Sequence, residues 1–111
     1  MIKRFVVLRR KPGMNVEQFR HHWENVHGPL IAKLPKLRRY VQHHVHSEIK
    51  DDHEIPIDGI AEIWFDSEED QKAAYASEEY QRVIADQPNL FERTSRCVHP
   101  VMTDRSVEIK S

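Results

Sequence analysis

Residues 2–19, IKRFVVLRRKPGMNVEQF, predict a strand, a chain break and the start of a helix in immediate succession. Segment 2–9 is rich in β-branched and aromatic residues, which is typical of a strand. Lys11-Pro12-Gly13 ends that strand, because proline removes a ladder donor and glycine permits a turn. Asn15 then stands at an N-cap position, with Gln18 three residues later as its capping-box partner.

The helix that follows Asn15 is expected to be amphipathic. Its apolar face consists of residues that recur at helical spacing: Val16, Phe19, Trp23, and Val26 or His27. Gly28 is expected to end this helix, and Pro29 to open a second, short helix at its first position.

The same order of elements returns in the second half of the chain. Residues 38–48, RRYVQHHVHSE, predict a long second strand, and residues 59–65, GIAEIWF, predict a third. Ser67 and Asp70 form another capping box, which predicts a helix through Tyr75.

The C-terminal quarter of the chain completes the pattern. Ser77 restarts the helix, and Pro88 ends it. Residues 94–102, TSRCVHPVM, predict a fourth strand, which Pro100 restricts to a sheet edge or a bulge. In the tail at 104–111, SVEI is a candidate for a short extra strand.

The element order β-α-β-β-α-β predicts an α+β fold, the ferredoxin-like arrangement, as a single domain over residues 1–111. Helices then cover only one face of the antiparallel sheet, and the other face needs a cover. A second copy of the chain is the simplest cover, since an exposed apolar sheet favours aggregation. We therefore expect a homodimer.

Composition excludes several classes of function. Charged residues make up 32% of the chain with a formal net charge of -1, so the basic excess of a nucleic-acid-binding protein is missing. No segment approaches membrane-spanning length. The single cysteine, Cys97, has no intrachain partner, which fits a cytoplasmic location. The three glycines do not cluster into a phosphate-binding loop.

The second predicted strand carries a row of polar groups on one side: Tyr40, Gln42, His44 and His46. An inner strand encloses part of such a row, and enclosed polar groups need partners or a ligand. Two interpretations stay open, a ligand-binding pocket and a hydrogen-bonded or solvated row. On the third strand Glu62 and Trp64 share one side, and Phe65 lies on the other.

His27 lies in the last turn of its helix, on the same face as Trp23 and Phe19. The helix dipole at that end favours the imidazolium form, which predicts a raised pKa. One interpretation is that His27 caps the helix carbonyls. The other is that it is a general acid or base directed into a pocket.

A metal site is a further interpretation of the polar residues on these strands. His44, His46 and Glu62 could form a set of two histidines and a carboxylate. A strand H-x-H pattern is common without a metal, so we expect none here. Cys97 has no nucleophile motif around it and is expected to be a small buried thiol.

Residues 9–45 and 58–70 together resemble the EthD-domain family, named from ethyl tert-butyl ether degradation, of the dimeric α/β-barrel superfamily. The resemblance rests on F-x3-W-x3-HGP, then LP-x-L-x-x-Y-V, then a strand ending in WF. It implies two ferredoxin-like subunits whose sheets form a dimeric α/β barrel, with a small-molecule pocket in each.

One relative, methylmuconolactone methylisomerase, has pocket residues that match His27 and Tyr40 of this chain. The resemblance to this isomerase also implies a functional cysteine on strand three, and the matching position here is Ile63. This departure argues against the same isomerisation. It leaves a general proton-transfer role for His27 intact.

The resulting hypothesis is an enzyme without a cofactor, of isomerase, cyclase or lyase type, acting on a small hydrophobic, aromatic-derived or lactone-like carbonyl compound. His27 would transfer the proton, and Tyr40 and His44 would hydrogen-bond the developing enolate. The expected substrate-binding residues are Trp23, Gln42, His46, Glu62, Trp64 and Phe65. The alternatives are a non-catalytic binding or accessory protein, for a hydrophobic molecule or a partner oxygenase, and a haem- or metal-binding oxidoreductase.

Overall fold

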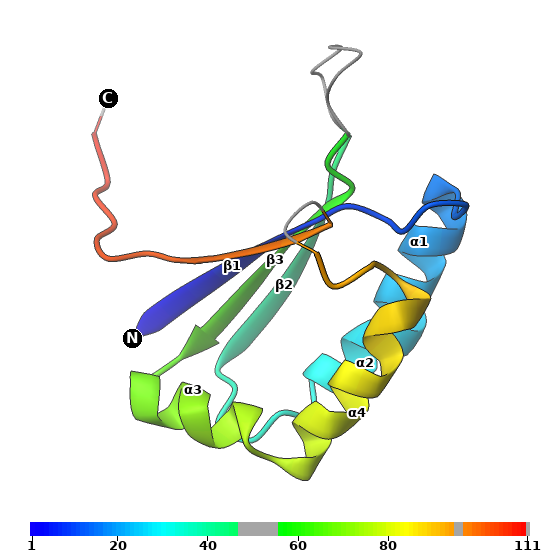
Figure 1. The fold of residues 1–111 in the computed structure, drawn as a ribbon. Helices are drawn as coiled ribbons and strands as arrows, with labels where there is room; N and C mark the ends of the chain where they lie inside the picture. The colour runs from blue at the N-terminus through cyan, green and yellow to red at the C-terminus, as the bar shows by residue number, and fades with distance from the viewer. Residues whose placement is uncertain (47–55, 95–96, 111) are drawn as a thin grey trace.

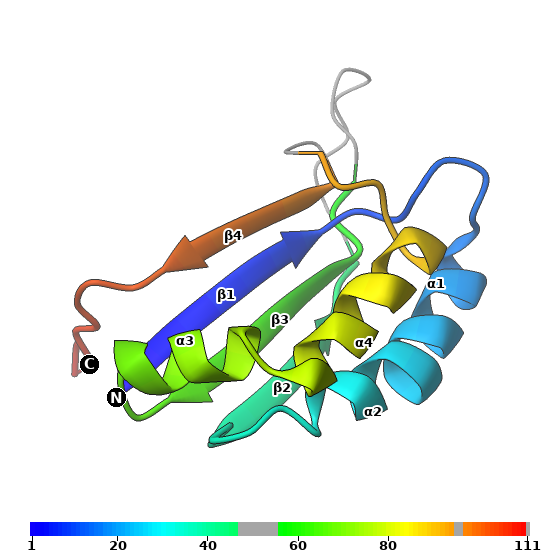
Figure 2. The same cartoon turned by 60° about the horizontal axis from the view of Figure 1, so that its bottom comes forward.

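The computed structural model describes residues 1–46, 56–94 and 97–110. Four antiparallel strands form one sheet in the order β2-β3-β1-β4 (Figures 1 and 2). The strands are β1 Ile2–Leu8, β2 Arg39–His44, β3 Gly59–Phe65 and β4 Val98–Met102. The helices are α1 Val16–His22, the π turn η1 Trp23–His27, α2 Gly28–Ile31, α3 Glu68–Tyr75, α4 Glu78–Asp86 and the 3₁₀ turn η2 Gln87–Asn89. The fold is therefore ferredoxin-like α+β, as predicted.

The helix starts follow from local sequence. At the start of α1, Asn15 Oδ1 accepts from the Gln18 backbone N–H at 2.8 Å, and Gln18 Oε1 accepts from the Asn15 N–H at 3.0 Å. This capping box satisfies two N–H groups that the helix cannot pair internally. The hydroxyl of Ser67 accepts from the Asp70 N–H at 3.1 Å and so caps α3, and Ser77 caps α4 in the same way.

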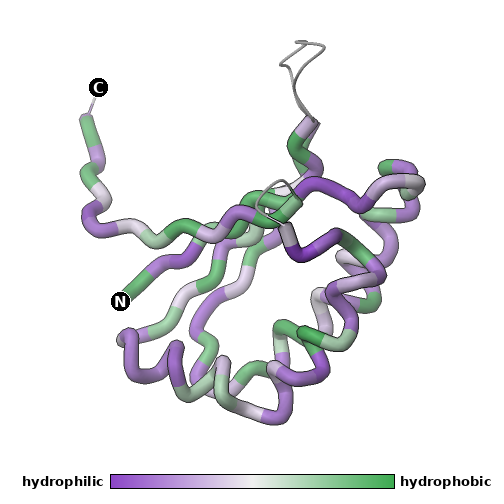
Figure 3. The backbone as a smooth tube through the Cα atoms, viewed as in Figure 1, coloured by the Kyte–Doolittle hydropathy of each residue, from purple (hydrophilic) through white to green (hydrophobic). Residues whose placement is uncertain are grey.

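All helices lie on one face of the sheet (Figures 1 and 2). Along β3, buried and half-buried residues alternate, and the buried set Ala61, Ile63 and Phe65 faces the helices. In Figure 3 the strands carry hydrophobic stretches, whereas α3 is largely hydrophilic. The core is centred on Phe19 and Trp23 of the first helix, which pack against this inner face.

The opposite face, which we call the open face, carries no helix. The strand register places on it the outward residues of all four strands. Its apolar members are Phe5, Val7, Val41, Ile60 and Val101.

The helix does not stop at Gly28, contrary to the prediction. Gly28 has right-handed helical backbone angles (φ -54, ψ -48), and its N–H bonds to the Trp23 carbonyl five residues back. Pro29 has no N–H and cannot make the ordinary helical bond to the Asn25 carbonyl, and the helix widens into a π turn immediately before this proline. A β-carbon on Gly28 would lie 2.8 Å from Gln42 Nε2, so this glycine permits a close approach rather than a turn.

The strand ends are shorter than the sequence indicated. β2 ends at His44, and residues 47–48 of the predicted strand lie outside the described residues, as do 95–96 of the fourth. Pro100 lies on the edge strand β4 opposite Val6, which confirms the edge prediction. The SVEI segment at 106–109 forms no strand. Every helix within the described residues is too short or too polar to span a membrane.

Candidate functional site

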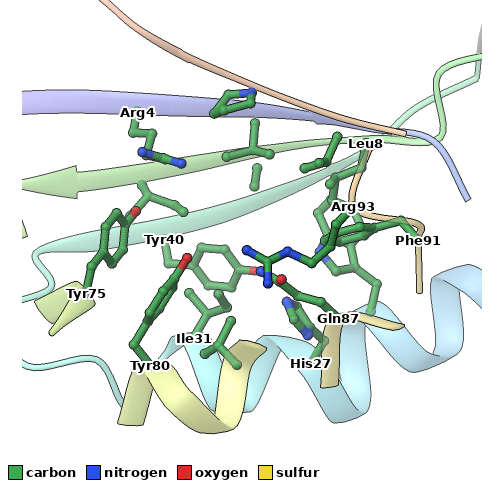
Figure 4. Close-up of a pocket in the computed structure, with 17 residues that line it drawn as sticks. Arg4, Leu8, His27, Ile31, Tyr40, Tyr75, Tyr80, Gln87, Phe91 and Arg93 are labelled. Atoms are coloured by element: carbon green, nitrogen blue, oxygen red, sulfur yellow. The ribbon is translucent and has the colours of Figure 1, made fainter. Parts of the chain in front are cut away.

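A cavity of about 220 Å³ lies between the inner face of the sheet and the helices (Figure 4). All four strands line it, together with η1, α2, the end of α3, α4 and the segment after α4. Most of its wall is apolar or aromatic. Since an engineered cavity of about 150 Å³ holds benzene, this one has room for a compact organic molecule.

His27 lines the cavity at the end of the π turn. Its side chain is only 6% exposed, and its Nδ1 lies 2.8 Å from Oδ2 of Asp86, the last residue of α4. Within the described residues, the hydrogen bond of this side chain goes to Asp86 and not to a carbonyl of its own helix. The geometry therefore departs from the capping interpretation and places the ring at the cavity wall.

Asp86 collects several donors. His22 Nε2 lies 2.9 Å from each carboxylate oxygen, and Asn89 Nδ2 donates to Oδ1 at 3.0 Å. Burial raises the pKa of Asp86, but the hydrogen bonds from Asn89, His27 and His22 outweigh this and lower it overall. Asp86 is therefore a carboxylate at neutral pH. A carboxylate can only accept, so it accepts a hydrogen bond from a protonated Nδ1 of His27.

Burial lowers the pKa of His27 below its ordinary 6.5, and the hydrogen bond and charge of Asp86 restore only part of this loss. The prediction of a raised pKa is wrong, because desolvation by burial lowers the pKa of His27 by more than the Asp86 carboxylate raises it. The neutral ring keeps its proton on Nδ1, which leaves the Nε2 lone pair available. Within the described residues, Nε2 makes no hydrogen bond.

Tyr40 lines the same cavity from β2. Its hydroxyl oxygen accepts from Gln42 Nε2 at 2.7 Å. Burial raises the pKa of Tyr40 to about 12, although hydrogen bonds from Gln42 and Trp23 lower it in part. The phenol therefore stays protonated, and because its oxygen is already an acceptor, its O–H is free to donate to a ligand.

Gln42 lies beside the cavity and holds Tyr40 and the π turn together. Its Nε2 also donates to the Trp23 carbonyl at 2.8 Å, and its Oε1 lies 3.3 Å from His44 Nε2. Trp23 itself forms part of the cavity wall. His44 packs against the Trp23 ring, with centroids 4.8 Å apart, and is not among the cavity-lining residues. His46 follows β2 and is exposed.

Glu62 and Trp64 lie on the open face, away from the cavity. Trp64 Nε1 donates to Glu62 Oε2 at 2.6 Å, and Glu62 Oε1 lies 3.0 Å from His43 Nε2. Phe65 is on the inner face, but it packs in the core against the edge of Tyr75 rather than on the cavity. The structure thus brings His27, Tyr40 and Trp23 together at the cavity. It places Glu62, Trp64 and Phe65 away from the cavity.

His44, His46 and Glu62, the three residues considered as metal ligands, do not converge on one site. Glu62 faces the open side of the sheet, whereas His44 faces the helices. Across residues 1–46, 56–94 and 97–110, no cluster of three or more histidine, cysteine, aspartate or glutamate side chains could hold a metal ion. Cys97 is a buried free thiol, as expected.

Sequence reasoning missed several cavity residues. Tyr80, Val83 and Gln87 recur at helical spacing, a pattern that could have placed all three on one inward face. Arg4 is two residues before Val6 in β1, so both side chains lie on the inner face of the sheet, although Arg4 is charged. For Asp86 no local signal exists, because its partner His27 lies 59 residues away.

These features define the class of protein: a ferredoxin-like domain with one helical layer, whose sheet and helices line a cavity on which polar side chains converge. The EthD domain family matches residues 11–94, more than half of the chain. The chain belongs to the EthD domain family, as its sequence motifs indicated.

Solved structures with the same fold resemble the whole chain. An EthD family protein from Bacillus halodurans is 19% identical with a TM-score of 0.72, covering 96% of this chain and 100% of its own. A dimeric ferredoxin-like protein of unknown function from Thermobifida fusca is 14% identical with a TM-score of 0.67, covering 92% and 88%. The hydroxynitrile lyase of Passiflora edulis is 14% identical with a TM-score of 0.64, covering 96% of each chain. No curated protein matches the chain.

Proposed function

We propose that this protein is a cofactor-independent enzyme that moves a proton at a carbon next to a carbonyl. The substrate is a small aromatic-derived or lactone-like compound that fits the cavity. One observation carries the proposal: His27, bonded through Nδ1 to Asp86 at 2.8 Å, lines the same cavity as the hydroxyl-bearing Tyr40. A base held by a carboxylate, facing a hydrogen-bond donor, is the arrangement that enolisation needs.

In the proposed step, Nε2 of His27 takes the proton from the carbon, and the C–H electron pair moves into the carbonyl to form an enolate. The Tyr40 O–H donates to the enolate oxygen as its charge develops. Asp86 stabilises the imidazolium that forms, in the role of an orienting carboxylate. The imidazolium then returns a proton to the same carbon, which gives hydrogen exchange, or to another carbon of the enolate, which completes an isomerisation. In a lyase reaction the enolate electron pair instead forms a C=C bond and expels the leaving group, which takes up the proton from the imidazolium.

The surroundings support this chemistry. The Trp23 side chain and the Ile63 side chain are buried and line the cavity, so they exclude water from the reacting atoms. The fold hosts enzymes elsewhere, for example the Passiflora edulis lyase. One scaffold serves many chemistries, so this likeness is an analogy at the level of the fold. The proposed proton transfer rests on the residues that line the cavity.

Deuterium exchange tests the proposal. A panel of small lactones and cyclic ketones is incubated in D₂O with the protein, and loss of the C–H signal next to the carbonyl is followed by ¹H NMR. We expect protein-dependent exchange for at least one compound, and a loss of about 100-fold or more in His27→Ala. His21→Ala is the matched control, because His21 is exposed and its ring hydrogen-bonds to Asn25, away from the lining of the cavity.

Two outcomes would contradict the proposal. Full exchange by a folded His27→Ala protein removes the histidine from the chemistry. Compounds that bind tightly and return without exchange from the wild-type protein favour the alternative of a non-catalytic carrier.

We also propose that the protein is a homodimer in which the open faces of two sheets meet. The apolar residues of the open face support this, since an uncovered apolar sheet face favours association. Relatives of the same fold from Bacteroides fragilis and Thermobifida fusca are dimeric.

Light scattering coupled to size-exclusion chromatography tests the dimer. We expect twice the mass of the 111-residue chain, and a shift toward one chain mass in Val41→Glu, which places a charge on the open face. Val26→Glu is the control, because Val26 is an exposed apolar residue on the helical layer. A wild-type protein of single-chain mass would refute the dimer.

A further inference from the structure

Arg4 is a charged residue on the apolar inner face of the sheet. It lies in β1 opposite Ile63 and shares its side of the strand with Val6 and Leu8. Figure 4 shows its guanidinium beside Tyr75 at the edge of the cavity, and the guanidinium carbon is 5.2 Å from the Tyr75 ring centroid. The side chain is half-buried, so its charge is only partly hydrated.

Among the described residues that line the cavity, this charge has no counter-ion. Arg4 and Arg93 both line it, and no aspartate or glutamate is among the described lining residues. In the described part of the chain, no carboxylate lies within ion-pair distance of either guanidinium. A charge in an apolar setting needs a partner, and one aromatic ring compensates it only in part. An anionic ligand would supply the missing partner.

The strand register gives the size of that anion. Arg4 of β1 and Tyr40 of β2 both pair with Ile63 of the intervening β3, so they stand at the same level on the same face. Adjacent strands are about 4.8 Å apart, which puts the two backbones about 10 Å from each other. A molecule of one or two rings spans the gap between the two side chains.

We propose that Arg4 binds a carboxylate of the ligand, so that the ligands of this cavity are compact organic acids. The carboxylate pairs with the guanidinium fork of Arg4, and a carbonyl at the other end of the molecule meets Tyr40 and His27. The anchor at Arg4 stands on its own geometry, whereas the reacting end rests on the proposed function. Arg4 is half-buried on an inner strand and braced by Tyr75, while Arg93 is exposed in the segment after η2.

Equilibrium dialysis of two matched probes tests the anchor. The probes are 7-methoxycoumarin-3-carboxylate and neutral 7-methoxycoumarin, which share a planar lactone and differ in one charged group. We expect the wild-type protein to bind the carboxylate about tenfold or more tightly than the neutral compound, as for a charge-assisted hydrogen-bonded pair. Arg4→Gln should abolish this preference and leave the affinity for the neutral probe within about twofold, because that probe gains nothing from the guanidinium charge.

Controls separate the anchor from net charge and from folding. Arg20→Gln removes the same charge from an exposed site on α1 and should keep the preference. Arg4→Lys keeps the charge but loses the bidentate fork, so an intermediate preference is expected with the fold retained. His27→Ala should keep the full preference, which makes the anchor testable even if the proposed proton transfer fails.

Several results would overturn the inference regardless of the exchange assay. One is a wild-type protein that does not bind the carboxylate or binds both probes equally. Another is a folded Arg4→Gln protein with an undiminished preference. The third is a preference that disappears only in Arg93→Gln, which would move the anchor to that residue.

Discussion

His27 Nδ1 lies 2.8 Å from Asp86 Oδ2, across 59 residues of sequence. The bond joins the end of the π turn to the end of α4, so each half of the chain supplies one partner. It fixes the direction of the imidazole ring and the nitrogen that carries its proton. The candidate site therefore depends on the packing of the two halves against each other.

Replacing Asp86 with asparagine should slow the exchange reaction about 10- to 100-fold, because the imidazolium formed on His27 loses its compensating charge. The amide is close in size to the carboxylate, so the fold should persist. NMR of the His27 ring nitrogens reports the tautomer, and we expect a mixture in place of the single Nδ1–H form. Unchanged exchange with an unchanged tautomer would contradict the role of Asp86.

The free energy of unfolding should fall as the pH drops below 6.5. Burial lowers the pKa of His27 below this ordinary value, so the unfolded chain takes up the proton at a higher pH than the folded one. Protonation therefore favours unfolding in a window that begins near 6.5 and extends to the folded pKa. The window of Asp86 lies lower, because its pKa is lowered from 3.8.

Urea unfolding at a series of pH values between about 5 and 7.5 measures this dependence. His27→Gln keeps a polar side chain but does not titrate, so its stability should vary less with pH over the same range. An identical slope in the wild-type protein and the variant would show that the pH dependence arises from other groups.

Tyr40→Phe should lower the exchange rate about 100-fold while leaving probe binding nearly unchanged, because the hydroxyl acts on the charge that develops during the reaction. The pKa of Tyr40 is raised to about 12, so its own ionisation should not reduce the rate at pH values up to about 10. Exchange rates of the wild-type protein and of Tyr40→Phe, measured up to about pH 10, check both the loss of rate and the absence of an effect of Tyr40 ionisation. If the exchange rate of the wild-type protein fell near pH 10 and that of Tyr40→Phe did not, ionisation of Tyr40 would have to begin at a lower pH than expected.

Gly59→Ala should destabilise the protein by about 1–3 kcal/mol, the usual cost of overpacking a core. An added β-carbon would lie 2.6 Å from Cζ3 and 2.7 Å from Cη2 of Trp23, and this indole is fully buried. Urea unfolding gives the cost directly. In a double-mutant cycle with Trp23→Phe, the two losses should sum to more than the loss of the double variant; strict additivity would place the strain elsewhere.

Asp58→Ala should cost about 1–3 kcal/mol, because it leaves two donors of Arg10 without their acceptor. The carboxylate is buried and accepts from the Arg10 backbone N–H at 2.9 Å and from Nη1 at 2.6 Å. Asp66→Ala is the control, since its pair with Arg38 spans 3.6 Å between two exposed side chains and should contribute less than about 1 kcal/mol. Equal effects of the two substitutions on urea unfolding would contradict this ranking.

Local chemistry explains why much of the fold could be predicted. The caps at Asn15, Ser67 and Ser77 and the alternation along Gly59–Phe65 are patterns within a few residues, and they recur in the structure as expected. Together with the element order they indicate the ferredoxin-like topology.

The candidate site was harder to predict because it depends on relations between distant segments. Alternation shows which residues of one strand share a face, but only the register between two strands shows that Tyr40 faces the same way as Ile63 and not as Glu62. In the same way, helical spacing could not reveal that Asp86 of α4 would lie beside His27 and raise its pKa, while burial lowers it by more. That balance depends on burial as well as on the carboxylate.

The π turn at Trp23–His27 makes the position of His27 depend on the number of residues as much as on their identity. Successive residues of a helix are separated by about 100° around its axis. Loss of one residue between Trp23 and His27 would restore an ordinary helical turn and rotate one of the two side chains away from the sheet. A one-residue deletion among Glu24, Asn25 and Val26, three exposed positions, would thus be more harmful than replacing any of their side chains. Among homologous chains, alignment gaps should therefore avoid this turn even where its residue types vary.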